Sequence, residues 1–151
     1  MQDAFGGIVN IFLILIFLVI VEGILAFAVS YTKAFRMKNF VISTIEQYEG
    51  GSGCFVQKEE TACKEKIKSH ASIIAYKPTT LNCHNNQISV DGLFCVDPNG
   101  YDCAGPHDNS AQSRCYRITT QVDINLPIVN KIMGLEFFQV SGDTRTINVN
   151  Y

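Results

Sequence analysis

The stretch IVNIFLILIFLVIVEGILAFA, residues 8–28, decides the fold of this chain. Its 21 residues include two strongly polar side chains, Asn10 and Glu22. At about 1.5 Å of rise per residue, a helix of this length spans ~30 Å, the thickness of the hydrocarbon core of a bilayer. A core helix of a soluble domain would carry polar residues far more often. We therefore expect a membrane-spanning helix, preceded by a short polar tail at residues 1–7.

The span is expected to be an uncleaved anchor with a functional glutamate. Residues 1–7 have no Lys or Arg and the apolar run is long, whereas a signal peptide has a basic start and a shorter run. Glu22 lies six residues, or ~9 Å, inside the expected edge of the span at Ala28. A carboxylate there costs roughly 2.5–3.5 kcal/mol on insertion scales. We favour a partner for Glu22 on a neighbouring helix; the alternative is that Glu22 reaches the outer interface.

The helix is expected to continue beyond the membrane as an amphipathic extension over residues 29–49. Neither Pro nor Gly occurs between Gly23 and Gly50. Apolar residues recur at intervals of three and four, which places them on one stripe of a helix. The glycines at 50–53 would end the helix. We expect the rest of the chain to pack on the stripe, which consists of Ala34, Met37, Val41, Ile45 and Tyr48.

Six cysteines follow the apolar run, and none precedes it or lies within it. An even number in a small domain predicts three disulfides, which persist in oxidising compartments. Zinc is the alternative, but no two of these cysteines have the C-x₂-C spacing that is typical of zinc sites. The sequence leaves about 15 pairings open. The predicted disulfide residues are Cys54, Cys63, Cys83, Cys95, Cys103 and Cys115.

Two signals for topology disagree. Lys33, Arg36 and Lys38 follow the span, so the positive-inside rule alone would place this flank in the cytoplasm. Disulfides, in contrast, are rare in cytosolic proteins. We give the cysteines more weight and expect a single-pass cell membrane protein whose C-terminal domain is extracellular.

The remainder predicts a small head, so that the whole chain belongs to the α+β class. Within a cysteine-rich loop region, residues 54–115, a short amphipathic helix fits 57–73, with Thr61 as a candidate N-cap. Short strands fit 87–90 and 93–96. The last part, 116–151, predicts a three-stranded antiparallel sheet packed on the long helix. Its strands would be 116–126, half-buried because apolar and polar residues alternate, then 135–140 and 144–149, joined by a hairpin at 141–143.

No constellation typical of an enzyme occurs in the sequence, and we expect no cofactor and no metal. His70, His84 and His107 are dispersed and lack the i, i+4 spacing of helical metal ligands. The net charge is −2, and the lysines at 64–68 alternate with acidic residues, as on a solvated helix. A nucleic-acid partner is therefore not expected.

One loop has the residue types of a calcium site. Asp97, Asn99, Asp102 and Asp108 surround a glycine turn, and calcium prefers such oxygen ligands. The register of an EF-hand is not matched, and no glutamate closes the loop. A β-turn held by the cysteines at 95 and 103 is the simpler interpretation.

Motifs at both ends of the chain resemble one family. At the N-terminal end VEG is followed by a helical stalk and then by IEQYEG, at residues 21–23, 31–39 and 45–50. At the C-terminal end the motifs are YRI, LPI and SGDTRTI, at residues 116–118, 126–128 and 141–147. Together they resemble the TadE-type minor pilins, or pseudopilins, of tight-adherence pili, especially the Gram-positive forms. The resemblance covers residues 1–50 and 116–151.

The resemblance implies a pilin-like structural subunit or minor pilin of a pilus or secretion filament, located in the membrane. Its partners would be other pilin-like subunits, through helix packing, and the pilus assembly platform. Glu22 would fix the register of the helix against a neighbour. The sequence departs from the usual pilin precursor, because no basic residue precedes Gly7 and the fifth residue after it is Phe12. The alternative function is a membrane-tethered extracellular binding or adhesion module with a disulfide-stapled head.

Overall fold

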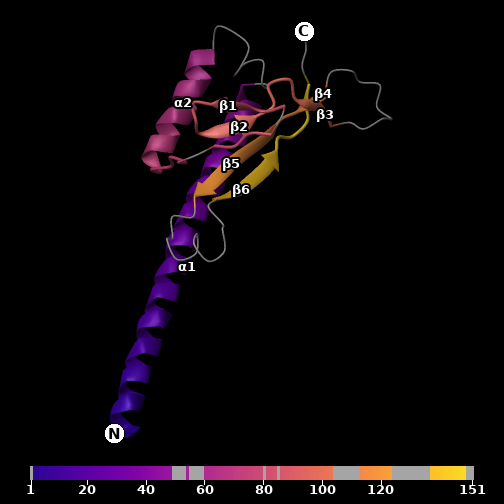
Figure 1. The fold of residues 1–151 in the computed structure, drawn as a ribbon. Coiled ribbons are helices and arrows are strands. Elements are labelled where there is room, and N and C mark those ends of the chain that lie inside the picture. Colours follow the sequence, from indigo (N-terminus) through magenta and orange to yellow (C-terminus); the bar gives the residue numbers. More distant parts are fainter. Residues whose placement is uncertain are drawn as a thin grey trace.

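The structure, a computed structural model, describes residues 2–48, 54, 60–79, 81–84, 86–103, 113–123 and 137–148. The chain is an α+β protein with a long apolar N-terminal helix, small antiparallel sheets and three disulfides. Figure 1 shows the strands and the second helix gathered around the C-terminal half of the long helix, whose N-terminal half extends away from them. We call the part formed by residues 30–148 the head. The expected α+β class is confirmed.

Helix α1 (Gln2–Gln47) runs without a break for 46 residues, or ~69 Å. It begins at Gln2, so the segment 1–7, expected to be a tail before the helix, is helical from its second residue. Gly6 and Gly7 weaken a helix, but neither removes a backbone hydrogen bond as proline does, and the apolar run beyond them continues the helix. The expected glycine end at 50–53 lies outside the described residues.

The predicted apolar stripe forms the centre of the head. Ala34, Met37, Val41 and Ile45 are each 0% exposed, and Tyr48 packs against the same core. Helix α1 lies mainly against two neighbouring strands, β5 and β6. The amphipathic extension and its packing on a sheet are therefore confirmed.

The main sheet has four antiparallel strands in the order β1-β2-β5-β6. Their bounds are Ile88–Val90, Phe94–Val96, Arg117–Asp123 and Phe137–Asp143. The two short strands predicted near 87–90 and 93–96 are thus confirmed as β1 and β2, which pair with each other. The turn between them needs positive φ at Asp91 (51°) and Gly92 (69°), a conformation that Asp-Gly sequences favour.

Strand β5 is buried on both faces, whereas alternation predicted a half-buried strand. Thr119 and Gln121, on the face expected to be solvated, are 2% and 1% exposed. Helix α1 covers the other face, where Thr120 Oγ1 donates to the Ala34 carbonyl at 3.1 Å. The segment before β1 covers the Thr119 face, with Gln87 Nε2 donating to Thr119 Oγ1 at 3.4 Å. Polar side chains can be buried there because they are hydrogen-bonded.

The predicted hairpin at 141–143 is wrong, because β6 continues straight through these residues. Ser141, Gly142 and Asp143 pair with Thr119, Ile118 and Arg117 of β5. A Cβ atom on Gly142 would lie 3.0 Å from Lys38 Cδ and 3.1 Å from Ile42 Cδ1. This glycine therefore serves a close approach of strand and helix, and does not serve a turn.

The expected three-stranded sheet over 116–151 is also wrong. β5 and β6 belong to the four-stranded sheet, while β7 (Ile147–Asn148) joins β3 (Tyr101–Asp102) and β4 (Ser113–Cys115) in a second sheet of order β3-β4-β7. The cysteine-rich region thus supplies four strands, of which β3 and β4 were not predicted from its turn-rich sequence. Residues 124–126, 135–136 and 149 of the expected strands lie outside the described residues.

Helix α2 (Glu60–Ile73) confirms the amphipathic helix expected at 57–73. Thr61, the candidate N-cap, lies inside the helix, so that expectation is wrong. The helix packs on α1 through buried Ile67 and Ala71, and the ring of His70 stacks on Phe40 with 3.7 Å between centroids.

Candidate functional site

The N-terminal half of α1 is a bare apolar surface. Every residue from 6 to 20 is exposed, and Ile8 and Phe17, at 68% and 65%, have typical values. By length and composition, this helix is able to cross a membrane. Glu22 lies exposed on this half, and within the described residues of the chain it has no hydrogen-bond or ion-pair partner. Any partner that it has must therefore come from another molecule or from outside the described residues.

All six predicted cysteines form disulfides, and each bond joins a cysteine to the next cysteine along the chain. The pairs are Cys54–Cys63, Cys83–Cys95 and Cys103–Cys115. The first joins α2 to Cys54, the second joins β2 to the segment before β1, and the third joins β4 to the residue after β3. Each bond therefore closes a short segment of the head, and the first, Cys54–Cys63, lies within the buried core. Sequence did not choose this pairing, because the spacings allowed every combination.

The residues considered for calcium form a turn. Asp97 Oδ1 accepts the Asn99 N–H at 3.0 Å, and the Asp97 carbonyl accepts the Gly100 N–H at 3.2 Å. The turn was expected to be held by the cysteines at 95 and 103; these two do not pair with each other but belong to two different bonds, one on each side of the turn. In the described part of the chain no three His, Cys, Asp or Glu side chains are placed to hold a metal ion. Asp108 lies outside it.

The three histidines do not come together. His70 is stacked on Phe40, and His84 is exposed in the segment between α2 and β1. His107 lies outside the described residues. The His70 ring thus has a packing role between the two helices.

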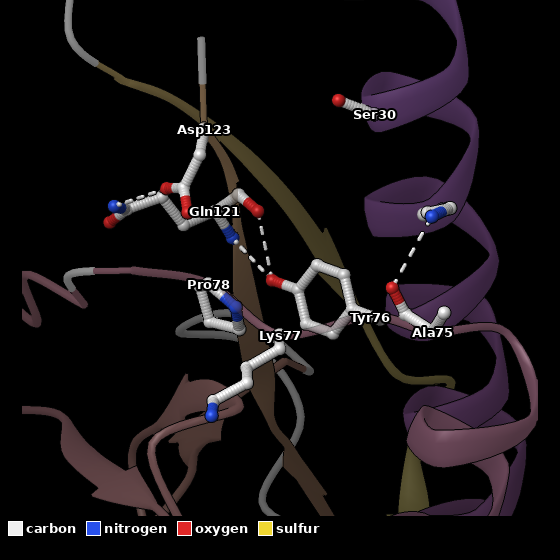
Figure 2. A pocket seen from close by; sticks show the side chains of 8 residues that line it. Ser30, Ala75, Tyr76, Lys77, Pro78, Gln121 and Asp123 are labelled. Carbon is white, nitrogen blue, oxygen red and sulfur yellow. Dashed lines mark hydrogen bonds between the residues drawn. The ribbon is translucent and has the colours of Figure 1, made fainter. Parts of the chain in front are cut away.

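A small cavity lies where α1 leaves its bare half and enters the head (Figure 2). It has a volume of about 180 Å³ and is bordered by Ser30 and Lys33 of α1 on one wall. Lys33 Nζ donates to the Ala75 carbonyl at 3.4 Å. The opposite wall is the end of β5, with Gln121 and Asp123. A cationic side chain and an anionic side chain therefore border the same cavity at the base of the head.

The Asp123 carboxylate is held in place by two donors. It accepts the backbone N–H of Thr79 and, at 3.1 Å, Gln121 Nε2. Lys77 also borders the cavity, but Figure 2 shows its ammonium group directed away from Ser30. The Lys33 ammonium and the Asp123 carboxylate thus lie on opposite walls of the cavity.

The inner wall of the cavity is Tyr76, which is 7% exposed. Its hydroxyl donates to the Gln121 carbonyl at 2.9 Å and accepts the Gln121 N–H at 3.0 Å. Burial raises the pKa of Tyr76 to about 12; the backbone of Gln121 opposes this shift, and the charge of Asp123 adds to it. The phenol is therefore a neutral structural group at neutral pH.

Sequence analysis missed this cavity. Tyr76 lies in a segment for which the sequence predicts neither helix nor strand, and Asp123 falls on the polar face of the strand expected at 116–126. One available signal was the depth of Ser30 and Lys33, which follow the expected edge of the span at Ala28 by two and five residues. The helix pattern alone places Ser30 and Lys33 just beyond the span. The residues of β5 that face them cannot be identified until the fold is known.

A larger open groove of about 690 Å³ lies between α2 and the turn that joins β1 to β2, and it shares residues 75–78 with the small cavity. Ala71, Leu81 and Leu93 border it, and Lys68 forms an ion pair of 3.6 Å with Asp91 across one end. The described residues thus offer three surfaces for function: the bare half of α1, the small polar cavity and this groove. No protein-family model matches the chain, and searches of curated proteins and of solved structures find no match.

Proposed function

We propose that this chain is a membrane-anchored, pilin-like structural subunit or minor pilin, which assembles through its N-terminal helix into a tight-adherence-type pilus or secretion filament. The observation that carries the proposal is that one continuous helix has two different surfaces. Its residues 6–20 are exposed and, apart from Asn10, apolar, while the stripe of Ala34, Met37, Val41 and Ile45 forms the centre of the head. Disulfides agree with a head outside the cell.

The continuity of α1 supports assembly over simple tethering. A tether requires a span and a linker, whereas here α1 enters the head with no interruption between Gln2 and Gln47. Helices that pack side by side through residues 6–29 would therefore also fix the positions of their heads. Such packing covers apolar surface that otherwise faces lipid, and small residues or buried polar groups then decide which helices associate.

Glu22 is the group that would set the register of packed helices. It lies on the bare half of α1, where a charge is costly in lipid unless it has a partner. A cation or donor on a neighbouring helix would supply that partner. A polar group of this kind restricts a helix pair to the one register that satisfies it, at some cost in stability.

Photocrosslinking in cells that produce the full chain, with its assembly platform, tests the proposal. A photoreactive residue replaces Phe17 on the bare half, or Ser72, which is exposed on α2, as the matched control position. We expect a ladder of crosslinked multimers from position 17. Glu22→Ala should reduce that ladder about tenfold, while Asn10→Ala, the other polar change in the span, should leave most of it. If the photoreactive residue at position 17 yields only the monomer, the proposal is wrong.

A second candidate is a membrane-tethered binding or adhesion module. The groove beside α2 favours this function, because a purely structural head that only contacts neighbouring subunits needs no open groove of about 690 Å³. Here Leu93→Asp, at the edge of the groove, should abolish adhesion of producing cells, whereas Glu22→Ala should leave adhesion unchanged. The opposite pattern supports the pilin-like subunit.

A further inference from the structure

The cavity at the base of the head lies at the depth of lipid headgroups when α1 spans a bilayer. Ser30 and Lys33 follow Ala28 by two and five residues, or ~3 and ~7.5 Å along the helix. Each headgroup layer is about 5–8 Å thick, from the difference between the whole bilayer and its hydrocarbon core. This step relies on the membrane anchoring in the proposed function, but not on assembly into a filament.

Exposed aromatic side chains support that depth. Phe27 and Tyr31 follow one another along α1, each 39% exposed, with 6.2 Å between their ring centroids. Phe138, near the start of β6, is 50% exposed at the same end of the sheet, opposite Val122. Aromatic residues are enriched at the level of the headgroups, where their rings contact both apolar and polar surroundings. The base of the head therefore carries the surface typical of a membrane interface.

The α1 wall of the cavity offers donors to an anion. An ammonium group has three N–H donors, and Lys33 uses one of them on the Ala75 carbonyl, at a long distance of 3.4 Å. Figure 2 shows the Ser30 hydroxyl projecting from α1 into the same space. Lys33 and Ser30 together suit the oxygens of a phosphate group.

The β5 wall offers an acceptor to a cation. The Asp123 carboxylate accepts bonds from Thr79 and Gln121, but a carboxylate can accept about four. Its charge would repel a simple anion that occupied the whole cavity, yet it suits a ligand with an ammonium group at its other end. The pair Lys33 and Asp123 therefore matches a zwitterion better than an anion.

We propose that this cavity binds the headgroup of phosphatidylethanolamine, with its phosphate at Lys33 and Ser30 and its primary ammonium at Asp123. Phosphatidylglycerol carries the phosphate but has no cation for Asp123. Phosphatidylcholine carries a quaternary ammonium, which is larger and has no N–H to donate. The cavity of about 180 Å³ holds a single small headgroup between the two walls.

Native mass spectrometry of the full chain in neutral detergent, titrated separately with the three dioleoyl lipids, tests the proposal. We expect phosphatidylethanolamine to bind about tenfold more tightly than the other two. Lys33→Gln should weaken binding of phosphatidylethanolamine about tenfold. Asp123→Asn should remove the preference over phosphatidylglycerol. Arg36→Gln is the matched control, because Arg36 is an exposed cation on the same flank that does not border the cavity.

Equal affinity for the three lipids would overturn the proposal, as would an equal loss from Arg36→Gln and Lys33→Gln. Soluble phosphoethanolamine is a further probe: if it binds with the same dependence on Lys33 while the lipid does not, the lipid source is wrong. Thermal unfolding of each variant shows that the head remains folded. Flotation with liposomes separates the two proposals, because a chain that floats without lipid preference contradicts this inference alone, and one that does not float contradicts the anchoring.

Discussion

At the scale of single residues, the Tyr76 hydroxyl replaces a missing neighbour strand. Strand β2 pairs with β5 at Ile118 and Thr119. Two residues further along, both backbone groups of Gln121 bond to Tyr76 instead. Because buried backbone groups must be paired, this one hydroxyl allows β5 to extend beyond β2 towards the base of the head.

Tyr76→Phe should therefore destabilise the head. It leaves the N–H and C=O of Gln121 without this partner inside the protein, and an unsatisfied buried group costs about 1–3 kcal/mol. We expect a decrease of that size in the free energy of unfolding, measured by denaturant titration with near-ultraviolet circular dichroism. Tyr31→Phe, at a 39% exposed tyrosine of α1, is the control and should change stability by less than about 0.5 kcal/mol. Equal effects of the two changes would contradict the role of Tyr76.

The raised pKa of Tyr76 also predicts a pH dependence. The folded head holds this proton up to about pH 12, while an unfolded tyrosine loses it near pH 10. Its contribution to stability is therefore complete below pH 10 and is lost as pH rises from 10 to 12, at up to about 1.4 kcal/mol per pH unit. Unfolding at pH 9, 10 and 11 should show this decline, and Tyr76→Phe should make it smaller.

At the scale of the elements, Gly142 sets how closely β6 approaches α1. Gly142→Val would bring a side chain against Lys38 Cδ and Ile42 Cδ1 and should cost about 1–3 kcal/mol of stability. Combining it with Ile42→Ala makes room, so the double variant should lose less than the sum of the single changes. Ser89→Val, on an exposed position of β1, is the control for strand substitution. Additive losses in the double variant would contradict the steric explanation.

The two halves of α1 should respond differently to the same kind of substitution. Met37→Ala empties a fully buried position and should lower the stability of the head by about 2–5 kcal/mol. Phe17→Ala removes a larger side chain from the bare half, where it contacts nothing in the head, and should leave the unfolding of the head unchanged. Thermal unfolding of both variants in detergent tests the contrast. A comparable loss from Phe17→Ala would mean that the bare half contributes to the head.

At the scale of the whole molecule, the proposed topology predicts where the cysteines react. In intact cells, an impermeant reductant followed by an impermeant maleimide should label Cys83 and Cys103, the two half-buried disulfide cysteines, because the head faces outward. A cytoplasmic protein with a known reactive cysteine is the control and should be labelled after lysis. Labelling of the head only after lysis would show that the head is cytoplasmic, as the positive-inside rule alone predicts from Lys33, Arg36 and Lys38.

The sequence predicted those features of the molecule that depend on local periodicity. The apolar run at 8–28 and the stripe from Ala34 to Tyr48 gave the helix and its buried side. The alternation from residue 116 gave β5, but not the burial of Thr119 and Gln121, which depends on a segment some 40 residues earlier. Gly142 looked like a turn because sequence does not distinguish a glycine that bends a chain from one that admits a neighbour. The cavity could not be predicted either, because its walls come from three separate segments of the chain.

The unbroken course of α1 has a mechanical consequence. Between Gln2 and Gln47 the chain has no hinge, and the head is fastened to the last third of the same rod. A tilt of the rod within a bilayer would therefore become an equal tilt of the head, and a rotation about its axis would turn the head by the same angle. Over ~69 Å a tilt of about 20°, common for membrane helices, displaces the far end by roughly 24 Å. A pulling force on the N-terminal end of α1 would therefore be transmitted directly to the head.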